Sequence, residues 1–221
     1  MTDGTANLTT STHHALDGAV PRQPSLPFGG EQLPGDGSAV LVPGFLDAES
    51  ADETMDDLVS STPWEEQHLA MFGNIVPEPR LSSWHSDGIP YAYSGVERTP
   101  RPFTPLLQRL REMCTARSGA PFNSVLINYY RDGNDHLGWH ADNEVVNGPE
   151  PTIASISLGA ERRFDFRHNE TGEVVKVLLP HGSLLVMSGL SQQCWQHRIA
   201  KEPRLTGARV NLTFRNVLSM P

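Results

Sequence analysis

Two imidazoles and one carboxylate are spaced in this sequence so that they can bind one metal ion. His140 and Asp142 form a His-x-Asp pair, and His197 follows 55 positions after Asp142. Residues i and i+2 of an extended chain point to the same side, so His140 and Asp142 can share an ion. Such a set leaves open positions for a co-substrate and oxygen, as oxidative iron chemistry requires. The chain has nine histidines, so other third ligands and purely structural histidines stay open at this point.

Segment 209–215 alternates polar and apolar residues, which predicts a strand with one polar face. Four residues share that face: Arg209, Asn211, Thr213 and Arg215. Because guanidinium groups bind carboxylates bidentately, this face suits a small dicarboxylate. The same alternation puts Asn128 and Tyr130 together, where an amide and a phenol can complete the cradle. A half-polar strand facing water gives the same pattern and remains an alternative.

The elements that must position these side chains are mostly strands. Turn residues separate the predicted strands, which cover residues 39–42, 123–130, 153–158, 162–167, 173–179, 183–187 and 208–217. Short strands without helices between them predict a mainly β core whose antiparallel strands form a sandwich or barrel of jelly-roll type. With the helices that flank this core, the expected fold class is α+β.

Two helices are predicted before this core. Asp47 can cap a helix that runs to about Val59, and Thr104 can cap a second helix that begins at Pro105 and ends at Gly119. We expect residues 1–37 to be a disordered extension, 38–120 to hold helices and a recognition segment, and 121–221 to form the core.

Charge and cysteine content restrict the class of protein. The net charge is −9, but residues 1–60 hold ten acids and one base, so sixteen acids and sixteen bases balance in the rest. Cys114 and Cys194 form no disulfide framework or zinc-type spacing, and no apolar run has membrane-spanning length. We expect a cytoplasmic monomer without membrane contact.

The chain resembles the AlkB-type 2-oxoglutarate- and Fe(II)-dependent dioxygenases. The resemblance covers residues 121–217, with weaker similarity back to residue 72. Its carriers are Asn128-Tyr129-Tyr130, His140-Ala141-Asp142-Asn143-Glu144, residues 153–159, residues 181–185, Trp195-Gln196-His197 and residues 209–215.

The resemblance implies a double-stranded β-helix of jelly-roll or cupin type whose open end holds Fe(II), 2-oxoglutarate and O2. It makes His140, Asp142 and His197 the metal ligands. The residues that it assigns to 2-oxoglutarate are Asn128, Tyr130, Arg209, Asn211 and Arg215, with the two arginines at opposite carboxylates.

The resemblance also implies contacts with the substrate. Glu144 matches an acid that faces the damaged base, although a solvated acid is the alternative. Tyr91 and Tyr93 fall in a lid where an aromatic ring stacks on the extruded base, and Met71-Phe72 matches a finger that wedges into the duplex. Arg162 matches a phosphate contact. Tyr93 and Tyr129 depart from the Phe and Arg that the DNA-repairing animal members carry there.

The implied function is oxidative demethylation of N1-methyladenine and N3-methylcytosine in DNA repair, with release of formaldehyde. The expected partner is alkylated DNA, single- or double-stranded, and RNA or another alkylated substrate is the alternative within the family. A metal-binding β-barrel without catalysis and a zinc hydrolase are alternatives from other classes; the hydrolase leaves the arginine face unexplained.

Overall fold

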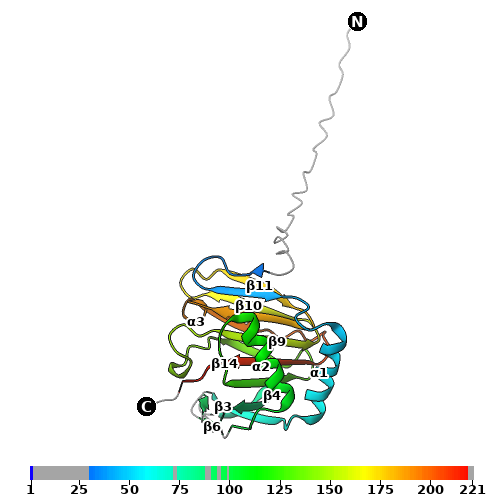
Figure 1. Ribbon diagram of the computed structural model, residues 1–221. Coiled ribbons are helices and arrows are strands. Elements are labelled where there is room, and N and C mark those ends of the chain that lie inside the picture. Colours follow the sequence, from blue (N-terminus) through cyan, green and yellow to red (C-terminus); the bar gives the residue numbers. More distant parts are fainter. Residues whose placement is uncertain (2–29, 72–73, 88–90, 94–95, 99, 219–221) are drawn as a thin grey trace.

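The computed structural model describes residues 1, 30–71, 74–87, 91–93, 96–98 and 100–218, without the side chains of 69–71, 91–93 and 96–98. Two antiparallel sheets face each other (Figure 1). The larger sheet has the order β1-β2-β12-β9-β14-β7-β4-β3, and the smaller sheet has the order β11-β10-β13-β8. This confirms the predicted mainly β jelly-roll core. No helix among the described residues is both long and apolar enough to cross a membrane.

Strands from both halves of the chain build the larger sheet. Its members are β1 (Gly30–Glu31), β2 (Ser38–Val42), β3 (Glu65–Met71), β4 (Asn74–Ser86), β7 (Ser124–Tyr130), β9 (Ile153–Gly159), β12 (Ser183–Ser188) and β14 (Arg209–Arg215). Residues on either side of position 120 therefore contribute to one sheet. Strands β3 and β4, which pair with each other and extend the sheet beyond β7, were not expected from the sequence.

The smaller sheet and the remaining elements complete the fold. The sheet consists of β8 (Leu137–His140), β10 (Arg162–His168), β11 (Val174–Leu179) and β13 (Trp195–Ile199). Strands β5 (Tyr91–Tyr93) and β6 (Val96–Arg98) pair with each other as a short hairpin and form a separate two-stranded sheet. The short helical turns are η1 (Val145–Asn147) and α3 (Ser191–Cys194).

Two longer helices begin at the caps that the sequence predicted, and the first runs two residues beyond the expected end at Val59. Helix α1 (Ala48–Ser61) starts after Asp47, whose carboxylate accepts a hydrogen bond from the Ser50 N–H at 2.8 Å. Helix α2 (Pro105–Ser118) starts after Thr104, with its proline in the first turn, where no N–H is needed. It ends at Gly119, whose φ of 72° lies in the left-handed region that glycine adopts without strain.

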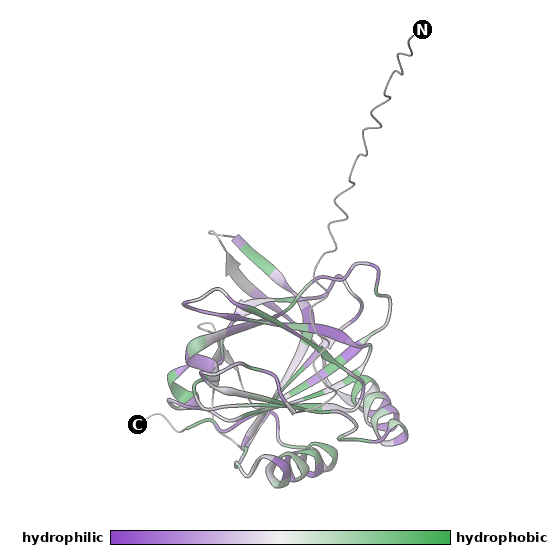
Figure 2. Ribbon diagram, turned by 90° about the horizontal axis from the view of Figure 1, so that it is seen from above, coloured by the Kyte–Doolittle hydropathy of each residue, from purple (hydrophilic) through white to green (hydrophobic). Residues whose placement is uncertain are grey.

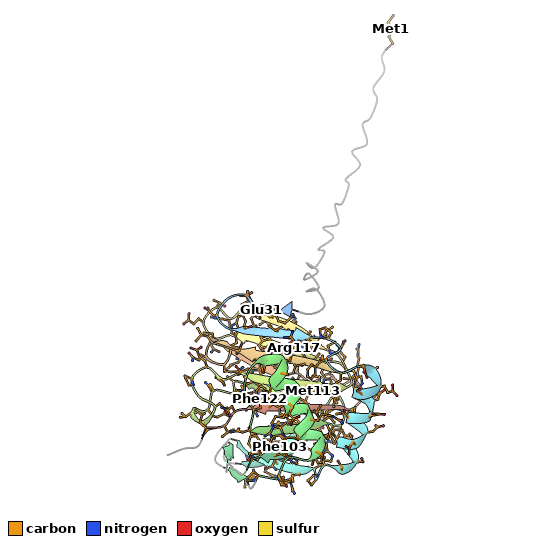
Figure 3. All side chains as sticks on the ribbon, viewed as in Figure 1. Met1, Glu31, Phe103, Met113, Arg117 and Phe122 are labelled. Carbon is orange, nitrogen blue, oxygen red and sulfur yellow. The ribbon has the colours of Figure 1, made fainter. Side chains whose placement is uncertain are left out.

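The two helices cover the outer face of the larger sheet, as the view from above shows (Figure 2). Leu58 of α1 and Leu107 of α2 belong to the same buried apolar cluster as Val210, Leu212 and Phe214 of β14. Three further apolar residues of this layer are labelled in Figure 3: Phe103, Met113 and Phe122. The apolar face of β14 is thereby buried, and its polar face is directed between the two sheets.

Candidate active site

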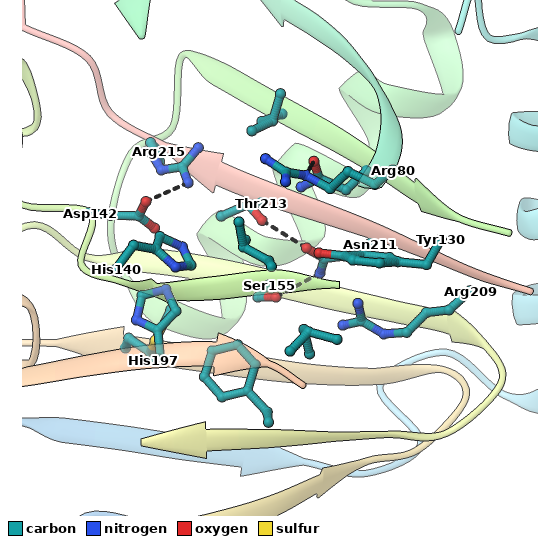
Figure 4. Close-up of a pocket in the computed structure, with 16 residues that line it drawn as sticks. Arg80, Tyr130, His140, Asp142, Ser155, His197, Arg209, Asn211, Thr213 and Arg215 are labelled. Atoms are coloured by element: carbon teal, nitrogen blue, oxygen red, sulfur yellow. Dashed lines mark hydrogen bonds and ion pairs between the residues drawn. The ribbon is translucent and has the colours of Figure 1, made fainter. Parts of the chain in front are cut away.

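His140, Asp142 and His197 come together between the sheets, as predicted. His140 ends β8 and lies opposite His197 of β13 in the strand register. The potential ligand atoms of the three residues all lie within 4.8 Å of one another. Figure 4 shows the two rings and the carboxylate turned toward a common point. Asp142 lies just after β8, so its position depends on the loop that follows the strand.

The two imidazoles present free nitrogens to this point. His140 Nδ1 is 2.9 Å from the carbonyl oxygen of Gly138, so Nδ1 donates to that oxygen and Nε2 is the ring nitrogen left for a metal. His197 is buried, and its Nδ1 has no hydrogen-bond partner among the described residues. Burial, followed by the charges of His140 and Arg215, lowers the pKa of His197 to about 3 despite the opposing effect of Asp142. A neutral ring is the form that binds a metal.

The Asp142 carboxylate is held ionised and oriented. Burial disfavours its charge, but Arg215, His197 and His140 outweigh that effect and lower the pKa of Asp142 to about 2. Arg215 Nη2 lies 2.8 Å from one carboxylate oxygen, Oδ1. The backbone N–H of Asp142 donates to the Gln192 side chain at 2.9 Å. Gln192 is a positioning residue that sequence reasoning missed, because nothing near position 192 marks it.

The polar face of β14 lines one pocket with the three potential ligands. The pocket lining includes Asn128, Tyr130, Arg209, Asn211, Thr213 and Arg215. All six are buried, so the interpretation of 209–215 as a strand facing water is wrong. The amide of Asn211 is engaged by the protein: Nδ2 donates to Ser155 Oγ at 2.8 Å, and Oδ1 accepts from Thr213 at 3.0 Å.

Arg209 carries a buried charge that the described residues leave uncompensated. The residue is 1% exposed, its Nη2 donates to Ser157 Oγ at 2.9 Å, and its guanidinium carbon lies 5.2 Å from the centroid of the Tyr130 ring. Nε and Nη1 have no hydrogen-bond partner in the described part of the chain. Burial lowers the pKa of Arg209 to about 10, while the nearby Tyr130 phenol opposes the shift. The guanidinium therefore remains a cation that lacks an anion.

Arg80 of β4 is a third guanidinium in the pocket, and the sequence did not mark it. Its Nη2 lies 2.8 Å from the Glu78 carboxylate, and its Nε donates to Asn128 Oδ1 at 2.9 Å. Arg80 and Arg215 are thus each paired with a buried carboxylate. Of the three arginines in the pocket lining, Arg209 is the one without a carboxylate partner among the described residues.

These residues fit Fe(II) and a dicarboxylate. Two imidazoles and an ionised carboxylate on one side form the donor set that non-haem iron oxygenases use. The Arg209 guanidinium, whose Nε and Nη1 have no hydrogen-bond partner among the described residues, can donate to a carboxylate at the other end of the same pocket (Figure 4).

The structure corrects one expected substrate contact. Arg162 is fully buried, and its guanidinium donates to the carbonyl oxygens of Asp132, Asp135 and Ala200 at 3.2, 3.0 and 2.7 Å. A side chain with this environment cannot reach a phosphate in solvent. It instead ties the segment before β8 to the segment after β13.

Glu144 lies two positions after Asp142, one of the three potential metal ligands. It is half-buried, and it is not among the residues that line the pocket. Its carboxylate accepts a hydrogen bond from Asn147 Nδ2 at 2.9 Å. The other expected substrate contacts lie outside the described residues: Phe72 entirely, and the side chains of Met71, Tyr91 and Tyr93.

Comparisons with known proteins agree with this geometry. The family described as the 2OG-Fe(II) oxygenase superfamily matches residues 38–215. The alpha-ketoglutarate-dependent dioxygenase alkB homolog 3 of Rattus norvegicus is 41% identical over 191 residues, which are 82% of this chain and 64% of that protein. The Homo sapiens DNA oxidative demethylase ALKBH2 is 38% identical over 180 residues, which are 76% of this chain and 69% of that protein.

A solved structure described as "The structure of OsALKBH1" superposes with a TM-score of 0.57, covering 80% of this chain and 97% of that chain. At 15% identity this likeness bears on the fold alone. The chain spans less than two thirds of the homolog 3 proteins that it matches, 64% of the rat protein and 66% of the mouse protein.

Proposed function

The chain belongs to the AlkB family within the 2OG-Fe(II) oxygenase superfamily, and on that premise we propose that it removes alkyl groups from nucleic-acid bases by oxidation. The observation that carries the proposal is the pocket itself. A His-Asp-His set and an uncompensated arginine line one buried space, so a metal and a dicarboxylate can bind side by side.

In this proposal His140, Asp142 and His197 hold Fe(II), and Arg209 binds the distal carboxylate of 2-oxoglutarate. Arg215 stays with Asp142 and faces the other end of the co-substrate, near Asn128 and Asn211. Iron with 2-oxoglutarate and O2 supplies the oxidant that hydroxylates the alkyl carbon. The protein orients the reactants in a pocket that excludes water.

The proposed substrate is a cationic methylated base, N1-methyladenine or N3-methylcytosine, in DNA. A relative named DNA oxidative demethylase supports DNA over RNA. A methyl group on the pairing edge weakens base pairing, which reduces the cost of turning the base out of the stack. Glu144, next to the metal candidates in sequence, attracts such a cation. Hydroxylation followed by cleavage of the N–C bond releases formaldehyde and a proton and restores the base.

The segment 38–120 contributes recognition of the nucleic acid in this proposal. Tyr93 stacks on the base with Tyr91 beside it, and Met71 and Phe72 occupy the gap that the base leaves. The expected disordered extension of residues 1–37 is wrong at its end, because β1 pairs with β2 and Leu33 is buried in the core. The proposal gives residues 1–37 no part in the chemistry.

The test is a turnover assay with iron, 2-oxoglutarate and O2 on methylated oligonucleotides of single-stranded DNA, duplex DNA and RNA. We expect formaldehyde and succinate in equal amounts, with DNA preferred, and loss of both in Asp142→Asn. Faster turnover of RNA contradicts the DNA assignment but not the site. Activity with zinc in place of iron, or no succinate under any condition, contradicts the proposed chemistry.

A further inference from the structure

Strand β4 carries a buried ion pair that none of the proposed chemistry uses. Glu78 and Arg80 are 2% and 3% exposed, and the Arg80 Nη2 to Glu78 Oε2 distance is 2.8 Å. Removing two charges from water is costly, and an apolar pair of similar volume is often at least as stable. The pair is therefore poor evidence for stability alone, and the position of Arg80 in the pocket lining indicates another role.

Arg80 also contacts a neighbouring strand. Its Nε donates to Asn128 Oδ1 at 2.9 Å, and β4 pairs with β7 so that Ser82 lies opposite Asn128. A guanidinium has only donors, so the amide oxygen of Asn128 must be the atom that faces Arg80. The amide nitrogen is then directed away from Arg80. Since Asn128 lines the pocket, its two N–H donors are presented to whatever binds there.

Glu78 completes the arrangement by neutralising the charge of Arg80. With both partners buried, the guanidinium has one carboxylate at Nη2 and one amide oxygen at Nε. An unpaired Arg80 would compete with Arg209 for the carboxylates of the co-substrate, and it would repel a cationic base. The pairing leaves Arg80 free to orient Asn128 without adding net charge to the pocket.

We propose that the Glu78–Arg80 pair is a positioning device that holds the Asn128 amide with its N–H groups toward bound 2-oxoglutarate. The inference deepens the proposed function and rests on it. Arg80 acts through Asn128 and is not a ligand of the co-substrate itself.

The test measures binding of 2-oxoglutarate to protein loaded with Mn²⁺, without oxygen or nucleic acid. Glu78→Leu/Arg80→Met replaces both partners together, because removal of one leaves the other charge buried and unpaired. We expect about tenfold weaker 2-oxoglutarate binding, the size of one hydrogen bond to a charged group, with Mn²⁺ affinity unchanged. In turnover, KM for 2-oxoglutarate rises and kcat changes little.

A double-mutant cycle separates positioning from a general structural effect. If Arg80 acts through Asn128, then Asn128→Ala combined with Glu78→Leu/Arg80→Met binds 2-oxoglutarate no more weakly than Asn128→Ala alone. The conservative Arg80→Lys keeps a charge for Glu78 but loses the Nε contact, so it should also weaken binding. As control, Asp87→Asn/Arg111→Met removes an ion pair beside α2, outside the pocket lining, and should bind as the wild type does.

Wild-type affinity in Glu78→Leu/Arg80→Met overturns the inference, and so do losses that add in the combined variant. A wild-type protein that binds no 2-oxoglutarate overturns the proposed function, and this inference with it.

Discussion

Arg215 and Asp142 form an ion pair inside the pocket, with Nη2 of the arginine 2.8 Å from Oδ1 of the aspartate. The side chains are 7% and 3% exposed, so the pair is largely removed from water. Arg215 ends β14, the strand that also carries Arg209. At one end of β14, Arg215 contacts Asp142, the carboxylate among the three potential metal ligands. At the other end, Arg209 presents a guanidinium that no carboxylate among the described residues neutralises. The two arginines therefore have different surroundings, although both were expected at carboxylates of the co-substrate.

Arg215→Met should weaken metal binding more than co-substrate binding. The substitution removes the partner that orients Asp142, and loss of such an outer partner typically lowers metal affinity by about 10- to 100-fold. Anaerobic titration with Mn²⁺, followed by electron paramagnetic resonance, measures the change. An unchanged Mn²⁺ affinity would show that Asp142 needs no help from Arg215.

Arg209→Met should give the opposite pattern. Mn²⁺ affinity stays near that of the wild type, and 2-oxoglutarate binding weakens by about 10- to 100-fold because a charge-assisted contact with a carboxylate is lost. Arg209→Lys should recover part of this affinity, because a lysine offers the charge without the bidentate fork. Calorimetric titration of the Mn²⁺-loaded protein compares the variants. Equal affinity in Arg209→Met and wild type contradicts the assignment.

Arg162→Met should destabilise the protein by about 3 kcal/mol, since one buried and two partly buried carbonyl groups lose a charged donor. The segments around residues 132–135 and 200–205 should become more sensitive to limited proteolysis. Gly133 lies at their junction, where an added Cβ would come within 1.8 Å of the Glu202 carbonyl oxygen. Urea unfolding provides the stability, and exposed Arg117→Met on α2 is the control, expected within about 0.5 kcal/mol of wild type.

Acid should destabilise the fold partly through His85. Burial lowers the pKa of His85 below 6.5, and the nearby Arg101 adds to this, although the Pro102 carbonyl opposes it. The native state thus resists a proton that the unfolded chain accepts. The stabilisation is complete above pH 6.5 and is lost as the pH falls through the lower folded pKa.

His85→Gln removes this titration, so its melting temperature should fall less than that of the wild type between about pH 7.5 and about pH 5. The measurement is a melting curve at each pH. Parallel pH profiles for the two proteins would exclude His85 as a contributor.

The elements predicted correctly are those whose signals are local. The caps at Asp47 and Thr104, the left-handed Gly119 and the strict alternation in 209–215 each involve residues within a few positions of one another. Strands β3, β4, β8 and β13 were missed because they are short or interrupted by proline and polar residues, and pairing with neighbouring strands holds them in place.

The sequence by itself determined which residue types can hold a metal and which side chains of 209–215 share a face. The tertiary structure alone decided what lies opposite that face: Arg215 meets Asp142 across 73 positions, Arg80 meets Asn128 across 48, and Arg162 lies buried against carbonyls. The physical reason is that alternation fixes orientation within one strand, whereas the register and stacking of strands far apart in sequence determine which groups meet.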